Sequence, residues 1–230
     1  MNLTRTVAVV PARNEEARLP ETLYALAKIP GTEAVIVVDD ASSDATRAVA
    51  RASGADVIRT NGVNGKGGAM LSGFLRARRS DPEAILVCDA DLGGSAAGLS
   101  ALLDALTLES PVAVAAFPSS VAGGGGFGMV KRFARSRILY RTGFEPVEPL
   151  SGQRALLPDA LFRLPGIAPG FGAEVGMTLD LLAAGITTVE TPFPLTHRAT
   201  GKKLAGFSHR ARQGYDVLRA LRGERLRWPS

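Results

Sequence analysis

The sequence predicts an α/β protein with a mostly parallel sheet, helices on both faces of that sheet, and a single domain. Short apolar segments alternate with segments of helical spacing through the first half of the chain, which favours strand–helix–strand units. The apolar segments are continuous rather than alternating with polar residues, as is typical of parallel strands buried on both faces. A chain of 230 residues with 46% hydrophobic content can bury one full core but is too short for two ordinary domains.

The first half contains five expected strands separated by four expected helices. The strands are Thr6–Val10, Ala34–Val38, Ala55–Arg59, Ala84–Cys88 and Val112–Phe117. The helices are Glu15–Lys28, Ser43–Ser53, Gly67–Arg79 and Ala96–Leu106. In the first helix Leu19, Leu23 and Leu26 recur every three or four residues, which places them on one helix face.

The second half has a different character. Its expected elements are a glycine-rich loop (Ala122–Gly128), a basic helix (Val130–Tyr140), a segment Pro146–Leu150 that continues into Ser151–Leu156, a helix (Ala173–Ala184), a strand (Thr187–Thr191) and a long helix (Leu204–Leu221). The sequence has no internal repeat, and no linker is long enough to separate two domains. We therefore expect one domain over residues 1–230, in which residues 1–117 bind one ligand and residues 118–230 complete the site.

Composition and charge limit the location and the partners. No apolar run reaches the roughly 20 residues that a spanning helix needs, and Met1–Thr6 lacks the apolar core of a signal peptide. The single cysteine, Cys88, excludes an internal disulfide, and we expect it to be a buried, inert thiol in a cytoplasmic protein.

The positive charge is concentrated at the C-terminal end. Nine Lys and Arg residues follow position 197, against two acidic residues, so this tail carries +7 of a net charge of +5 and the rest carries −2. The tail could be a solvated helix face, bind phosphates, or make peripheral contact with an anionic membrane. No aromatic interleaving or reader motif favours a nucleic acid, so we expect none as partner. The oligomeric state stays open, with a homodimer as one option.

Polar residues follow the first four expected strands, and ligands of open parallel sheets bind beyond the carboxyl ends of strands. The loops that carry them contain Pro11, Ala12, Arg13, Asn14 and Glu15 after the first strand, Asp39, Asp40 and Asp44 after the second, Lys66 after the third, and Asp89, Ala90 and Asp91 after the fourth. One acidic strand end is unremarkable, because Asp often caps the next helix. Four together are hard to explain as caps alone, and indicate a shared binding site.

Asp89-Ala90-Asp91 is the strongest of these signals. Two carboxylates two residues apart beyond a buried strand can face one crevice, where they would repel each other unless a cation lies between them. Mg²⁺ or Mn²⁺ prefers such oxygen ligands and keeps positions open for phosphate oxygens. The alternative is a turn with a helix cap.

The other strand-end residues suit a nucleotide. Asp39 and Asp40 could accept hydrogen bonds from a base or a ribose, as could Asn14 and Glu15, or they could form an N-cap network with Asp44. Lys66 lies between glycines and suits a diphosphate.

Two further patterns have weaker support. Gly123, Gly125 and Gly128 match the spacing of a dinucleotide fingerprint, but they lie several residues past a strand, which argues against that function. His197, one of two histidines, could bind metal or phosphate, or could be an ordinary surface or packed histidine.

Together these residues resemble the family 2 glycosyltransferases. The segments that carry the resemblance are VVPARNEE (Val9–Glu16), VIVVDDASSDAT (Val35–Thr46), GKGGAM (Gly65–Met70) and CDADL (Cys88–Leu92). The family implies a GT-A fold, a nucleotide-sugar donor and a divalent cation, Mg²⁺ or Mn²⁺, at the D-x-D motif. Residues 1–117 would then be the nucleotide-sugar-binding half, and residues 118–230 the acceptor-binding half with its basic C-terminal helix.

The second half is most similar to the retaining glucosyl-3-phosphoglycerate synthases. The matching parts are Gly123–Gly128, Pro149–Gly152, Gly170–Glu174 (GFGAE) and the pair His197-Arg198. The resemblance implies that Asp91 and His197 contact metal or diphosphate, and that Glu174 meets hydroxyls of donor sugar or acceptor. It also implies that Asp40 and Glu15 hold the nucleoside, with Lys66 near them or near the diphosphate.

The acceptor is not fixed by these resemblances. The synthases carry Gly-Arg-Val-Thr where this chain has Gly126-Phe127-Gly128-Met129, with Lys131 a little later. Arg198, Gly201 and Lys202 instead resemble a stretch of the dolichol-phosphate mannosyltransferases, which transfer sugars to lipid phosphates with inversion. The expected acceptor-binding residues are Gly126, Phe127, Lys131, Gly152 and Lys202.

The expected reaction is sugar transfer from a donor such as UDP-glucose, with Glu174, Asp91 and Arg198 as catalytic residues. Metal at Asp89 and Asp91, with charge from Lys66 and Arg198, would stabilise the leaving diphosphate. Retention, which we favour, needs no protein base, whereas inversion needs a carboxylate, for which Glu174 is the best candidate.

Two other classes remain as alternatives. A sugar nucleotidyltransferase would carry a basic, glycine-rich signature after the first strand, and this loop is acidic and free of glycine. A non-catalytic binding module would not need the intact D-x-D motif. Release of pyrophosphate indicates the first class, release of a nucleoside diphosphate indicates a glycosyltransferase, and release of neither indicates a module.

Overall fold

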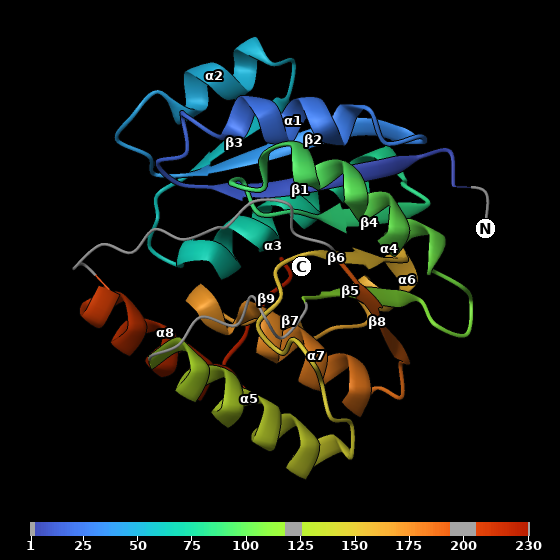
Figure 1. Ribbon diagram of the computed structural model, residues 1–230, viewed down its shortest axis with the longest axis vertical. Coiled ribbons are helices and arrows are strands. Elements are labelled where there is room, and N and C mark those ends of the chain that lie inside the picture. Colours follow the sequence, from blue (N-terminus) through green and yellow to red (C-terminus); the bar gives the residue numbers. More distant parts are fainter. Residues whose placement is uncertain (1–2, 118–125, 194–205, 230) are drawn as a thin grey trace.

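A seven-stranded sheet forms the centre of the protein (Figure 1). The computed structural model describes residues 3–117, 126–193 and 206–229, with the side chains of all of these except 126–127 and 206–212. The strands lie in the order β3 (Asp56–Thr60), β2 (Thr32–Asp40), β1 (Thr6–Ala12), β4 (Ala84–Val87), β6 (Arg154–Leu156), β5 (Val112–Ala116) and β8 (Thr188–Pro192).

The mostly parallel sheet that the sequence predicts is confirmed. β1, β2, β3 and β4 pair in parallel, as do β5 and β8, whereas β6 is antiparallel to both of its neighbours. β6 comes from the second half of the chain, yet it lies between two strands of the first half. The two halves therefore share one sheet.

Helices cover both faces of the sheet (Figure 1). On one face lie α1 (Leu19–Ala27), α2 (Thr46–Ala52), the 3₁₀ helix η2 (Gly93–Leu99) and α4 (Ser100–Asp104). On the other face lie α3 (Gly65–Ala77), α6 (Pro158–Phe162) and α7 (Ala173–Ala183). The outer layer, α5 (Gly126–Thr142) and α8 (Gly206–Leu221), packs on α7. The remaining elements are η1 (Arg78–Ser80), η4 (Gly170–Gly172) and a small antiparallel pair, β7 (Gly166–Ile167) with β9 (Leu226–Arg227).

Alternate residues of each strand supply two separate cores. Ala8, Val10 and Leu86 face α1 and η2, while Val7, Val9 and Ile85 face α3 and α7. Both sets are fully buried, as expected of parallel strands covered on both faces. Cys88 is free and buried, and burial raises its thiol pKa well above the ordinary value, in agreement with an inert thiol.

Several helix boundaries differ from the sequence prediction. The expected helix Glu15–Lys28 begins only at Leu19, because residues 15–18 form a turn and Pro20 favours the first turn of a helix. The expected helix Ala96–Leu106 divides into η2 and α4, since Gly93, Gly94 and Gly98 weaken helical preference there. Within the described residues, no helix is both long and apolar enough to cross a membrane.

Candidate functional site

A cavity of about 560 Å³ lies beyond the carboxyl ends of β1, β2 and β4, at the edge of the sheet where the sequence places the site. Its lining consists of Pro11, Ala12, Arg13, Glu15, Asp40, Gly65, Lys66, Asp89, Ala90, Asp91, Gly170, Phe171 and Asp216. The first ten of these, apart from Gly65, are residues that the sequence analysis assigns to donor or metal. The strand-end loops therefore do meet at one cavity.

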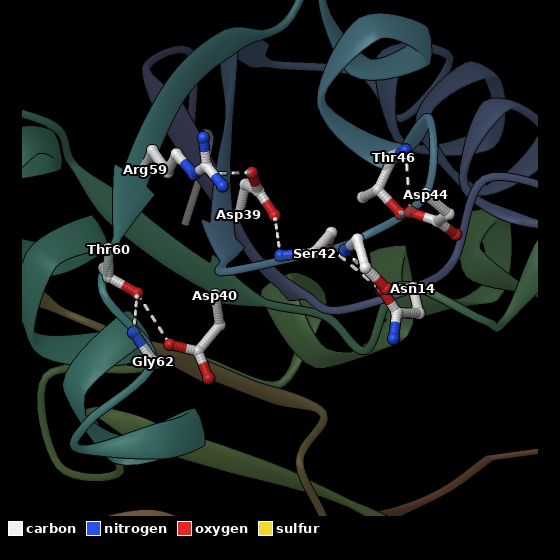
Figure 2. Close-up of polar contacts among 10 residues, drawn as sticks. Asn14, Asp39, Asp40, Ser42, Asp44, Thr46, Arg59, Thr60 and Gly62 are labelled. Carbon is white, nitrogen blue, oxygen red and sulfur yellow. Dashed lines mark hydrogen bonds and ion pairs between the residues drawn. The ribbon is translucent and has the colours of Figure 1, made fainter.

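Asn14 and Asp39 do not line the cavity but join the loops beside it (Figure 2). The side-chain oxygen of Asn14 accepts a hydrogen bond from the backbone N–H of Ser43 (2.9 Å), and its own N–H donates to Ser42 Oγ (3.0 Å). Asp39 accepts from the N–H of Ser42 (2.9 Å) and lies 3.8 Å from Arg59. These contacts fix the loop after β1 against the loop after β2.

Asp40 and Asp44 have different surroundings, although the sequence groups them. Figure 2 shows Asp40 directed away from Asp39, toward Thr60, whose Oγ1 donates to it at 2.6 Å. Asp40 lines the cavity and keeps its second oxygen for a ligand. Asp44 instead accepts from the N–H of Thr46 (2.9 Å), the first residue of α2, and from the N–H of Glu16 (3.3 Å). It thus joins the loop after β1 to the start of α2, although the N-cap residue of that helix is Ala45.

Lys66 lies at the centre of a partly buried charge network, in which the side chain of Glu174 is buried and that of Asp89 is 32% exposed. Its Nζ is 2.6 Å from Asp89 Oδ1 and 2.7 Å from Glu174 Oε1. Gln153 Nε2 donates to the other Asp89 oxygen at 2.6 Å. Burial by itself would lower the pKa of Lys66, but the two carboxylates outweigh it and raise that pKa. Burial likewise raises the pKa of Asp89, and Lys66 with Gln153 reverses this to a net lowering.

Gly152 makes this network possible. A Cβ at this position would lie 2.6 Å from Lys66 Nζ and 2.7 Å from Asp89 Oδ1, closer than the groups can tolerate. Arg154 holds the Ser151–Gln153 turn in place, because it donates to Ser151 O (3.0 Å) and to Thr178 Oγ1 (2.9 Å). Burial lowers the pKa of Arg154 to about 10.

Asp91 is the carboxylate of the D-x-D motif that remains available. Its nearest cation is Arg18, 3.6 Å away, and 33% of its side chain is exposed. Burial and then the charge of Asp89 raise the pKa of Asp91. Burial and then Asp91 raise the pKa of Glu15 as well. Negative charge is therefore crowded at this end of the cavity, and a cation would relieve the crowding.

The residues present fit a divalent cation that takes one carboxylate from the protein and most of its ligands from substrate phosphates and water. No cluster of three or more His, Cys, Asp or Glu ligands occurs in the parts of the chain that the structure describes. Both oxygens of Asp89 already have donors, which leaves Asp91 as the carboxylate that suits a metal. Mg²⁺ commonly binds one or two carboxylates and takes substrate phosphates and water as further ligands. His197, the third predicted metal ligand, lies outside the described residues.

Other predicted residues lie beyond the cavity lining. Glu174 touches Lys66 rather than the cavity, and Lys131 forms an ion pair with Glu148. Gly126 and Phe127 begin α5, and the side chain of Phe127 is outside the description. Arg198 and Lys202 also lie outside the described residues.

The structure adds residues that the sequence analysis did not assign. Gly65, Gly170, Phe171 and Asp216 line the cavity, and Gln153 binds Asp89. Gly170 and Phe171 belong to the GFGAE segment, so their motif was a usable signal. Asp216 lies within the basic tail, where no motif marks it.

Comparisons with known proteins agree with this arrangement. The family model for glycosyl transferase family 2 matches residues 7–168. The chain is 29% identical to an undecaprenyl-phosphate mannosyltransferase of Micrococcus luteus, with 88% of each chain covered. It is also 29% identical to a glucosyl-3-phosphoglycerate synthase of Mycobacterium tuberculosis, over 76% of this chain and 60% of that protein.

A solved structure of that synthase has a similar fold. Determined with Mn²⁺, UDP-glucose and phosphoglyceric acid, it matches with a TM-score of 0.75 and 25% identity, covering 95% of this chain and 79% of the other. The match to the family model covers residues 7–168, well over half of the sequence. The fold and the position of the D-x-D motif agree with that match. The chain therefore belongs to glycosyltransferase family 2, has the GT-A fold and is a glycosyltransferase.

Proposed function

We propose that the protein transfers a sugar, with glucose favoured, from a UDP-sugar to a phosphorylated acceptor, and that it requires Mg²⁺ or Mn²⁺. One observation carries this proposal. Five carboxylates line the cavity (Glu15, Asp40, Asp89, Asp91 and Asp216) against two cationic side chains (Arg13 and Lys66), counting the described residues. A diphosphate would be repelled from such a cavity unless a divalent cation accompanied it.

The donor is proposed to lie along the strand ends of residues 1–117. Asp40 and Glu15 would hold the nucleoside through the acceptor oxygens of their carboxylates, and Pro11, Ala12 and Arg13 would form the wall beside it. Asn14 and Asp39 would act indirectly, because they hold the two loops in place. The relative that binds UDP-glucose in its solved structure supports this choice of donor.

Asp91 would hold the metal, with Asp89 behind it and His197 as a further ligand from the second half. When bound, the metal would supply Lewis-acid stabilisation of the leaving diphosphate. Asp89 would contribute chiefly through Lys66, since both of its oxygens are occupied. Arg198 would add positive charge at the diphosphate.

Glu174 is proposed to position Lys66 rather than to act as a base. Its carboxylate is 3% exposed and lies 2.7 Å from the ammonium of Lys66, so the ion pair directs Lys66 into the cavity. A general base must instead reach the proton that it removes. This geometry favours retention, in which the leaving phosphate accepts the proton of the acceptor.

The acceptor half would be residues 118–230, with Gly126, Phe127, Lys131, Gly152 and Lys202 near the acceptor. Lys131 forms an ion pair with the carboxylate of Glu148, and the backbone N–H of Glu148 donates to Glu190 Oε1 at 2.8 Å. An anionic acceptor would compete with Glu148 for Lys131. This exchange is consistent with a phosphate-bearing acceptor.

Nucleotide binding tests the donor proposal directly. Thermal stability is measured with UDP, GDP, ADP and dTDP, and with UDP-glucose, each with and without Mn²⁺. Binding of UDP at a hundredfold excess over its dissociation constant should stabilise the fold by about 2.7 kcal/mol. Release of UDP rather than pyrophosphate then separates a glycosyltransferase from a nucleotidyltransferase. Absence of a shift with every nucleotide would contradict the proposal.

A lipid phosphate at an anionic membrane is the second candidate acceptor, and one surface favours it. Figure 1 shows α5 and α8 together on the outside of the molecule, where they pack through a shared core. Large apolar side chains are exposed there beside arginines. They are Met129, Leu139, Tyr140, Tyr215 and Leu218, with the exposed Arg132, Arg137 and Arg222. Such a mixture suits an anionic lipid surface.

Vesicle binding tests this second candidate. The protein should co-sediment with phosphatidylglycerol vesicles at low salt and should dissociate at high salt, because the contact is electrostatic. A variant with Arg132, Arg137 and Arg222 changed to Gln should bind at least about tenfold more weakly. The matched control changes Arg47, Arg51 and Arg79, which lie away from α5 and α8. Equal binding by both variants, or no binding by the wild type, would reject this candidate.

A further inference from the structure

Asp216 is the charged residue of the cavity lining to which the proposed function assigns no role. It lies on α8, more than a hundred residues beyond the D-x-D motif, and yet it lines the same cavity as Lys66 and Asp91. Asp216 as a whole is only 4% exposed. A carboxylate brought this deep into a protein costs free energy unless partners compensate for the lost water.

The GFG segment is shaped around this carboxylate. A Cβ at Gly170 would lie 2.1 Å from Asp216 Oδ2, and Gly170 has a φ of +58°. A Cβ at Gly172 would lie 2.4 Å from the backbone oxygen of Asp216. A side chain at Gly172 would therefore push the backbone of α8 away, and one at Gly170 would displace the Asp216 carboxylate. The close approach delivers Asp216 to the cavity wall between Gly170 and Phe171.

Asp216 is incompletely satisfied by the protein. Its Oδ2 accepts a hydrogen bond from the backbone N–H of Phe171 at 3.1 Å. Among the residues that the structure describes, no Lys or Arg lies within ion-pair distance of this carboxylate, and no donor is placed on Oδ1. Because Asp216 lines the cavity, this oxygen is available to a hydrogen-bond donor of a ligand bound there.

The chemistry of the group limits that ligand. A carboxylate only accepts hydrogen bonds, and it repels a diphosphate. The donors of a nucleotide sugar are the N–H of its base and its hydroxyl groups. Asp40 and Glu15 are proposed to hold the nucleoside, which leaves the hydroxyl groups as the donors for Asp216. Asp216 lines the cavity from the second half of the chain, whereas the loops proposed to hold the nucleoside come from the first half.

We infer that Asp216 is an additional donor-binding residue, which accepts a hydrogen bond from a hydroxyl of the nucleotide sugar. The inference rests on the proposed function, since it requires a nucleotide sugar in this cavity. Hydroxyls occur on the ribose and on the transferred sugar. The position of Asp216 beside the Glu174 helix favours the transferred sugar, and the experiment separates the two.

Isothermal titration of Asp216→Asn with UDP-glucose and with UDP, both with Mn²⁺, tests the inference. The amide can still accept from Phe171 N–H, but it presents N–H groups rather than an acceptor to the ligand. Affinity for UDP-glucose should fall roughly tenfold or more, as expected for loss of a hydrogen bond to a charged group. Unchanged affinity for UDP assigns the contact to the transferred sugar, and an equal fall for UDP assigns it to the ribose.

A matched variant separates binding from folding. Asp180 forms a partly buried ion pair with Arg225 at the far end of α7, so Asp180→Asn should lower the melting temperature and leave both affinities unchanged. Wild-type binding with equal affinity in Asp216→Asn would overturn this inference alone. Failure of the wild type to bind any nucleotide would overturn the proposed function, and this inference with it.

Discussion

Asp91→Asn is expected to abolish the gain in UDP affinity that Mn²⁺ provides, with a loss of at least about a hundredfold. Removal of an outer-shell partner alone typically costs 10–100-fold in metal affinity, and Asp91 is the carboxylate left free to touch the metal. Titration calorimetry with UDP, with and without Mn²⁺, measures this effect. Asp104→Asn, on the exposed end of α4, is the control and should bind as the wild type does.

Protonation of Asp91 at low pH should have the same effect on UDP affinity as the Asp91→Asn substitution. Because burial and Asp89 raise the pKa of Asp91, metal-assisted UDP affinity should begin to fall at a higher pH than an ordinary aspartate would cause. The raised pKa also means that ionised Asp91 destabilises the folded state above that pKa. Asp91→Asn should therefore be at least as stable as the wild type at pH 7. A variant that keeps the Mn²⁺ effect would refute the assignment of Asp91 as metal ligand.

Lys66→Met is expected to cost about 3 kcal/mol of folding free energy at pH 7, the low end for a broken buried ion pair. It leaves the buried carboxylate of Glu174 and the partly exposed carboxylate of Asp89 without their shared cation. The distances of 2.6 Å to Asp89 and 2.7 Å to Glu174 show that this one ammonium group contacts both carboxylates. Urea unfolding monitored by circular dichroism gives the free energy of unfolding. Lys28→Met, on an exposed position of the chain, should cost under about 1 kcal/mol.

The double variant Lys66→Met/Glu174→Gln tests the cause of that loss. Removing one of the two charges should restore part of the stability, since contacting residues couple by about 0.5–3 kcal/mol. The pKa of Asp89 is lowered in the wild type, so its contribution is present above the unfolded pKa and is lost as the pH falls through the folded pKa. The difference between wild type and Lys66→Met should accordingly shrink toward low pH. A loss that is independent of pH and of Glu174 would indicate a packing defect instead.

Much of the donor half could be predicted from the sequence. The continuous apolar strands specify a parallel sheet, and the residues that follow them must then meet at one edge. For this reason the sequence alone assigns Asp40, Lys66 and Asp91 to one site. The predicted helix boundaries were less accurate at Leu19 and at η2, where a local turn and glycines decide the conformation.

The individual functions of neighbouring carboxylates could not be predicted in the same way. Asp39 and Asp40 are adjacent in sequence, yet successive side chains of a strand point to opposite faces, so Asp39 contacts Arg59 while Asp40 lines the cavity. Similarly, both carboxylate oxygens of Asp89 accept hydrogen bonds, from Lys66 and Gln153, whereas the carboxylate of Asp91 remains available to a ligand. Gln153 reaches Asp89 only because β6 inserts antiparallel beside β4.

The sequence by itself therefore determined the sheet, the edge that binds ligand and the family. Tertiary structure alone decided which charges neutralise one another, and it brought Asp216 from the C-terminal helix to Gly170. The physical reason is the range of the interactions. Strand and helix preferences, and the position of a residue after a strand, depend on neighbours in the chain, whereas the pairing of buried charges depends on packing between segments that are distant in sequence.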